Sequence, residues 1–163
     1  MAIVACVELY KFTGDGWILL FPATISGKAL IHSMHSLCEM IDAELDRHIV
    51  PSLSSQPAVL GATLGVERGN LVRMMMNERA EYVGRALNVA CRLQNVAKER
   101  EPHAANEESV HARCYKALVS ARLYNERLAH VNMPYKVEST TSPLRNIMSG
   151  SRFACRNRLH GRR

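Results

Sequence analysis

The strongest indication of the fold is the stretch Glu81-Tyr-Val-Gly-Arg-Ala-Leu-Asn-Val-Ala-Cys-Arg-Leu-Gln94. Its apolar residues recur three and four positions apart, so it predicts an amphipathic helix. Asn88 and Arg92 are four residues apart and therefore share one face of that helix. A carboxamide and a guanidinium near a helix start suit a polyanion, above all a phosphate group that gains charge during a reaction. A surface helix without any ligand would show the same pattern.

A second stretch, Glu8-Leu-Tyr-Lys-Phe-Thr-Gly-Asp-Gly-Trp-Ile-Leu-Leu-Phe21, predicts a strand, a tight turn and a second strand. Gly14 and Gly16 supply the backbone freedom that such a turn needs. Asp15 between them has two interpretations. It is either a good turn former or a hard oxygen ligand for Mg²⁺ or Mn²⁺ at the tip of a rigid hairpin.

Together the two stretches resemble the catalytic domain of the class III nucleotidyl cyclases, the adenylyl and guanylyl cyclases. The segments that carry the resemblance are Lys11-Phe-Thr-Gly-Asp-Gly16 and Gly84-Arg-Ala-Leu-Asn-Val-Ala-Cys-Arg-Leu93. The resemblance implies a cyclase domain over residues 1–156, followed by a basic tail at 157–163. It also implies an α+β, ferredoxin-like sandwich with a mostly antiparallel sheet and helices packed on one face, truncated at its N-terminus.

Within this resemblance, Lys11 and Glu81 occupy the positions that read the base. An ammonium group only donates hydrogen bonds, so Lys11 suits the N1 acceptor of adenine and opposes the N1–H donor of guanine. Glu81 stands where the family usually has an Asp that accepts from the adenine amino group. The pair therefore favours ATP as substrate, with GTP as the alternative.

The resemblance also implies how the reaction is carried out. Asn88 would orient the ribose, Arg92 would stabilise charge on the transferring phosphorus centre, and Arg145 would contact the terminal phosphates. Asp15 would bind Mg²⁺ or Mn²⁺ in a two-metal site whose other carboxylate, a first-strand Asp, is missing. We therefore expect an adenylate cyclase, a phosphorus–oxygen lyase that makes cyclic AMP for signalling. A truncated or inactive cyclase-homology module that binds nucleotide or dimerises without turnover is the alternative.

The resemblance further implies a head-to-tail homodimer with sites shared at the interface. Five scattered cysteines without a Cys-x-x-Cys pair indicate reduced thiols and a cytoplasmic protein. No apolar run approaches the length of a membrane span, and the first residues lack the basic start of a secretory signal.

The net charge of +6 comes from the C-terminal end of the chain. No acid follows Glu138, whereas six arginines do, and the rest of the chain has 15 basic against 15 acidic residues. A basic tail can bind nucleic acid or anionic lipid. Because it lacks interleaved aromatic residues and a recognition helix, we expect a solvated end and no nucleic-acid partner.

The remaining sequence predicts alternating strands and helices without repeats. A short helix that Ser120 caps follows the strand at 110–119. Met74-Met75-Met76 could form a soft metal site or a flexible binding surface, but the buried core of a strand is the ordinary explanation. Strands are expected at about 3–12, 17–21, 59–66, a returning 71–76 after a turn at Gly69-Asn70, 110–119, 135–140 and 152–156, and helices at 26–48, from Asn88 to about 100, and 120–130.

Overall fold

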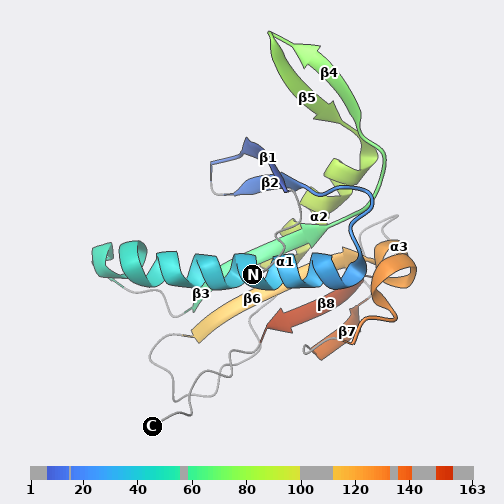
Figure 1. Ribbon diagram of the computed structural model, residues 1–163. Helices are drawn as coiled ribbons and strands as arrows, with labels where there is room; N and C mark the ends of the chain where they lie inside the picture. The colour runs from blue at the N-terminus through green and yellow to red at the C-terminus, as the bar shows by residue number, and fades with distance from the viewer. Residues whose placement is uncertain are drawn as a thin grey trace.

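The protein is described here by a computed structural model that covers residues 7–14, 16–55, 59–99, 112–132, 136–140 and 150–155. Its helices and strands form a mixed α+β fold, as the sequence predicted (Figure 1). No helix in these segments is long and apolar enough to cross a membrane.

A four-stranded sheet forms the centre of the fold. It consists of β3 (Val59–Val66), β6 (Ala112–Ser120), β8 (Gly150–Cys155) and β7 (Lys136–Thr140), in that order across the sheet. β3 and β6 are parallel over their whole shared length, whereas β6–β8 and β7–β8 are antiparallel. Parallel neighbours need a long crossover connection, and the helix α2 (Arg85–Glu99) lies in the connection from β3 to β6.

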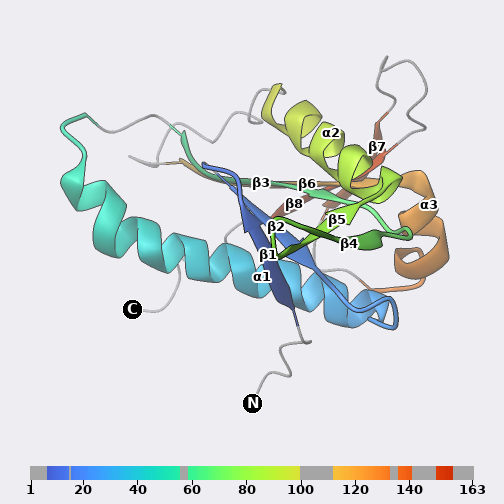
Figure 2. The same cartoon turned by 90° about the horizontal axis from the view of Figure 1, so that it is seen from above.

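The two long helices cover opposite faces of this sheet. Leu118 of β6 packs in one cluster with α2, whereas its neighbours Ala117 and Val119 pack in another with α1 (Gly27–Glu44). Consecutive residues of a strand point to opposite faces, so the helices must lie on different sides, as Figure 2 shows. The predicted placement of the helices on one face is therefore wrong. The physical reason is that β3 contains no charged residue, which is typical of a strand covered on both faces.

Two hairpins stand beside the sheet. β1 (Glu8–Phe12) pairs with β2 (Trp17–Leu20), and β4 (Val72–Met76) pairs with β5 (Arg79–Val83). The first was predicted. The second was not, because we expected 71–76 to return against 59–66.

The turn of the second hairpin explains this difference. Asn77 and Glu78 both have positive φ, 49° and 63°, which is the conformation of a two-residue hairpin turn whose twist matches the strands. The hairpin projects from the body of the protein (Figure 1), and all of β4 is exposed. The three methionines are 43–63% exposed, so the predicted core role of Met74-Met75-Met76 is wrong.

Serine residues cap α1 and the short helix that follows β6, and only the second of these caps was predicted. Ser26 accepts a hydrogen bond from the Ala29 amide at 3.2 Å, and Ser120 accepts one from the Leu123 amide at 3.2 Å, which confirms the predicted cap. The shorter elements are a π turn at Leu45–Ile49, a 3-10 turn at Val50–Ser52, the helix α3 at Ala121–Leu123 and a π turn at Tyr124–Leu128.

A glycine sets the distance between α2 and the sheet. A Cβ atom at Gly65 would lie 2.0 Å from the Ala90 carbonyl oxygen and 2.5 Å from the Gln94 amide nitrogen. Both are backbone atoms, so the helix itself would have to move. We expect Gly65→Ala to lower the free energy of unfolding by about 1–3 kcal/mol, as overpacking typically does.

Urea denaturation of the purified chain measures this effect. Gly16→Ala is the matched control, because a Cβ there meets no atom closer than 3.4 Å. Equal stabilities of the two variants would show that α2 does not pack against Gly65 as described.

Candidate functional site

An ion pair between two distant strands forms the centre of the candidate site. The Lys11 Nζ lies 3.1 Å from Glu81 Oε2 and 3.2 Å from Glu81 Oε1, although 70 residues separate them. β1 carries the lysine and β5 the glutamate. The two side chains are 49% and 28% exposed, so a ligand can reach both. The structure thus brings together the two residues that the sequence assigned to base recognition.

Two tyrosines hold the glutamate in place. The Tyr10 hydroxyl donates a hydrogen bond to Glu81 and accepts one from the Tyr82 amide at 3.0 Å. The two rings meet edge to face with their centres 5.0 Å apart. The Tyr82 hydroxyl in turn donates to Glu8 at 3.5 Å. Hydrogen bonds of the two tyrosines therefore hold β1 against β5 in addition to the Lys11–Glu81 ion pair.

A β-bulge allows two consecutive residues to reach Glu81. Leu9 is paired with Leu19 and Lys11 with Ile18, so β1 has one residue more than β2 at this point. In a regular strand, Tyr10 and Lys11 would point to opposite faces. A bulge changes the direction of side chains, and here both contact the same carboxylate.

The environment of Glu81 favours its charged form. The hydrogen bond from Tyr10, and next the hydrogen bond and charge of Lys11, lower the pKa of the Glu81 carboxyl below its ordinary value. An ionised carboxylate only accepts hydrogen bonds, and its two oxygens retain acceptor capacity beyond these two partners. Glu81 is thus suited to accept from an amino group.

Asn88 and Arg92 lie on the exposed side of α2, which begins four residues after Glu81. The sequence predicted a helix from Asn88, and the helix in the structure begins three residues earlier, at Arg85. Within the described residues, neither side chain has a hydrogen-bonding or ionic partner, so their donors are available to a ligand.

Two predicted residues, Asp15 and Arg145, lie outside the described residues. Among the residues that are described, no group of three His, Cys, Asp or Glu side chains could hold a metal ion. These residues alone therefore do not fit the Mg²⁺ or Mn²⁺ site that the resemblance implies.

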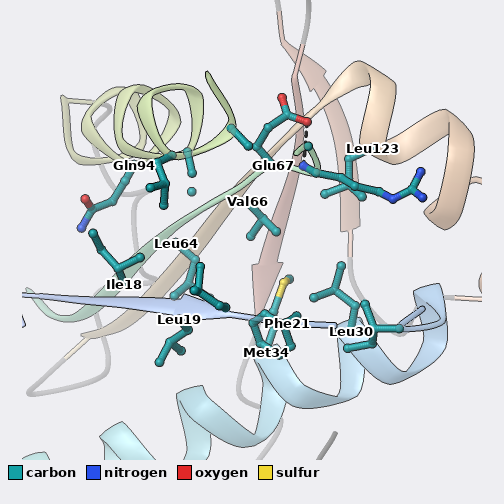
Figure 3. Close-up of a pocket in the computed structure, with 18 of the residues that line it drawn as sticks. Ile18, Leu19, Phe21, Leu30, Met34, Leu64, Val66, Glu67, Gln94 and Leu123 are labelled. Atoms are coloured by element: carbon teal, nitrogen blue, oxygen red, sulfur yellow. Dashed lines mark hydrogen bonds between the residues drawn. The ribbon is translucent and has the colours of Figure 1, made fainter. Parts of the chain in front are cut away.

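A cavity lies next to this surface. It has a volume of about 420 Å³ and is bounded by β2, β3, α1 and α2, with Ile18, Leu64 and Met34 among its walls (Figure 3). Lys11, Glu81, Asn88 and Arg92 do not line it. The candidate site is thus an open surface beside the cavity.

Sequence reasoning missed Tyr10 and Tyr82. Aromatic residues in strands are ordinary core candidates, and the bulge at Tyr10 has no glycine to mark it. Their position next to Lys11 and Glu81 in the sequence was the one available signal. Comparisons of the chain with protein-family models, with curated proteins and with solved structures found no match.

Removal of the Tyr10 hydroxyl tests the arrangement around Glu81. We expect Tyr10→Phe to raise the Glu81 pKa toward its ordinary value, because the hydrogen bond that contributes most to the shift is lost. The stability linked to a lowered carboxyl pKa is present above the unfolded-state pKa and is lost as pH falls through the folded-state value. The variant should therefore lose less stability than the wild type on acidification through this range.

NMR titration of the Glu81 carboxyl carbon measures the pKa directly. Tyr82→Phe is the matched control, because it removes a hydroxyl that contacts Glu8 instead of Glu81. The same Glu81 titration in wild type and Tyr10→Phe would contradict the described contact.

Proposed function

We propose that this chain is a nucleotidyl cyclase domain of the class III type, which converts ATP to 3′,5′-cyclic AMP and pyrophosphate. The observation that carries the proposal is the contact between Lys11 and Glu81. These residues are 70 positions apart, and the motif resemblance assigns both of them to the same base. Asn88 and Arg92 support it, because both offer unpaired donors on α2 within the described residues.

The base would be read by one donor and one acceptor. The Lys11 ammonium donates to adenine N1, and the Glu81 carboxylate accepts from the exocyclic amino group. Tyr10 keeps Glu81 ionised and oriented, so it acts as a positioning residue. Guanine presents the opposite pattern at these two atoms, which favours ATP over GTP.

The reaction itself would be supported by α2. The ribose 3′-oxygen forms a bond to the α-phosphorus, the bond from that phosphorus to the pyrophosphate oxygen breaks, and the 3′-hydroxyl proton passes to solvent. Asn88 would orient the ribose. Arg92 would donate to the phosphorus centre as negative charge develops there, which lowers the barrier if the contact strengthens in the transition state.

The rest of the proposal follows the resemblance. It includes a cytoplasmic homodimer with shared sites, Arg145 on the terminal phosphates and Mg²⁺ or Mn²⁺ at Asp15. Such an ion would supply Lewis-acid stabilisation of the phosphates when bound. Since the described residues do not by themselves form its site, we derive no step of the reaction through it.

An exchange of donor and acceptor tests the base assignment. In the double variant Lys11→Glu with Glu81→Cys, we expect weaker ATP binding and a shift of preference toward GTP. Each mispaired polar group should cost on the order of 1–3 kcal/mol. Calorimetric titration of both nucleotides measures the preference.

Lys28→Glu is the control for the charge change, because Lys28 is an exposed lysine on α1. An unchanged ATP:GTP preference in the double variant would mean that Lys11 and Glu81 do not touch the base.

Truncation of Arg92 tests the catalytic assignment. We expect Arg92→Ala to reduce cyclic AMP formation by roughly 10²–10³-fold, as the loss of one preorganised donor does, with little change in ATP affinity. Cyclic AMP production and nucleotide binding are measured on the same preparation.

Arg47→Ala is the control, since Arg47 is an exposed cation that pairs with Glu44 at 3.4 Å. ATP binding at the Lys11–Glu81 pair without any cyclic AMP from the wild-type chain would favour the nucleotide-binding module over the enzyme.

A further inference from the structure

The ion pair of the candidate site cannot by itself select a purine. Lys11 supplies donors and Glu81 supplies acceptors. Adenine matches this pattern with N1 as acceptor and its 6-amino group as donor. Cytosine presents the same pattern with N3 as acceptor and its 4-amino group as donor. Hydrogen bonds to this pair therefore oppose guanine but do not distinguish adenine from cytosine, and that choice requires a contact with the ring of the base.

One methionine of the second hairpin stands next to the ion pair. Met74 of β4 is directly opposite Glu81 of β5 in the antiparallel register. Residues opposite each other in such a pair point to the same face, with Cβ atoms about 5 Å apart. Met75, the next residue, points to the other face. Met74 is 43% exposed, against 63% for Met75, so its side chain is available to a ligand that reaches Glu81.

The face of the hairpin that carries Met74 and Glu81 is mostly apolar. Its other members in β4 and β5 are Val72, Met76, Arg79 and Val83. The three apolar members among them are more than half exposed. The hairpin projects from the body of the protein (Figure 1). An exposed apolar face with a few polar groups at its centre is typical of a ligand site.

A ligand on this face must satisfy a charged group and an apolar group together. The lowered pKa of Glu81 keeps its carboxylate charged, so a purely apolar partner surface over Met74 would cover that charge without supplying a donor. A planar base meets both requirements, because its edge carries a donor and an acceptor and its ring faces are apolar. Thioether sulfur also makes favourable contacts with aromatic rings.

We propose that Met74 selects a purine over a pyrimidine, by contacting the ring of the base whose edge Lys11 and Glu81 bind. The two fused rings of adenine offer this side chain more area than the single ring of cytosine, so the contact stabilises adenine more. The inference rests on the proposed assignment of Lys11 and Glu81 to the base. It depends neither on turnover nor on a metal ion.

Titration of the full 163-residue chain with free nucleosides tests the proposal. Adenosine is the probe, and cytidine is the ligand with the same donor and acceptor pattern. We expect the wild type to bind adenosine roughly fivefold more tightly than cytidine, and Met74→Ala to bring the two affinities within about twofold. Met74→Leu, which retains the apolar volume, should keep most of the preference. Met75→Ala is the matched control on the opposite face and should change neither affinity.

The methionine methyl groups report the contact directly. In the wild-type chain with ¹³C-labelled methionine methyls, adenosine should shift the Met74 resonance upfield, because the methyl group would lie over the ring. The Met75 resonance should stay in place. Met74→Leu and Met75→Ala identify the two signals by removing them. This measurement requires neither cyclic AMP formation nor a binding-deficient variant.

Three results would overturn the proposal. The first is adenosine binding that Lys11→Ala weakens but Met74→Ala does not, with no shift at Met74, and it would leave the base assignment intact. The second is no binding of adenosine or ATP by the wild type, which would reject the base assignment as well. The third is a dimer that Met74→Ala converts to a monomer while the adenosine-to-cytidine ratio stays the same, since a second copy would then cover this face.

A fourth result separates the inference from the proposed reaction. If Met74→Ala loses the adenosine preference in a chain that forms no cyclic AMP, the selection by Met74 is supported and only turnover is rejected.

Discussion

The parallel pairing of β3 with β6 is the constraint on which the other parts of the molecule depend. Two parallel neighbours cannot be joined by a tight turn, so the chain must cross over the sheet, and α2 makes this crossing. Because Gly65 has no side chain, the backbone of α2 can approach the backbone of β3 closely. The face of α2 that carries Leu93 is thereby buried, and the face that carries Asn88 and Arg92 is left to solvent.

The same crossing brings the two hairpins to the site. β5 leads directly into α2, so Glu81 is held a few residues before the helix that carries Arg92. The contact with β1 is made by side chains and by one bond from the Tyr82 main-chain amide to the Tyr10 hydroxyl, since the described strands of the two hairpins share no ladder. Tyr10 and Lys11 can make this contact together only because of the bulge between Leu9 and Lys11. A local irregularity of one strand thus determines the electrostatics of a residue 70 positions away.

Local patterns predicted much of the fold, and long-range contacts account for the errors. Helical spacing identified α1 and α2, and the cap at Ser120 was predicted correctly from that residue alone. The faces that the helices cover were misjudged, because they depend on which edge of β6 receives β3. Met74-Met75-Met76 is apolar and strand-forming, but nothing in these residues shows that β4 projects from the body. At the site, the resemblance paired Lys11 with Glu81. The contact of Tyr10 with Glu81 could not be predicted, because it depends on the bulge in β1.

The cavity and the candidate site share α2, which gives the two a physical connection. Ala90 and Gln94 line the cavity, Leu93 between them is in the core, and Arg92 lies on the outer face. These residues belong to about one turn of a helix, whose side chains move together when the helix moves.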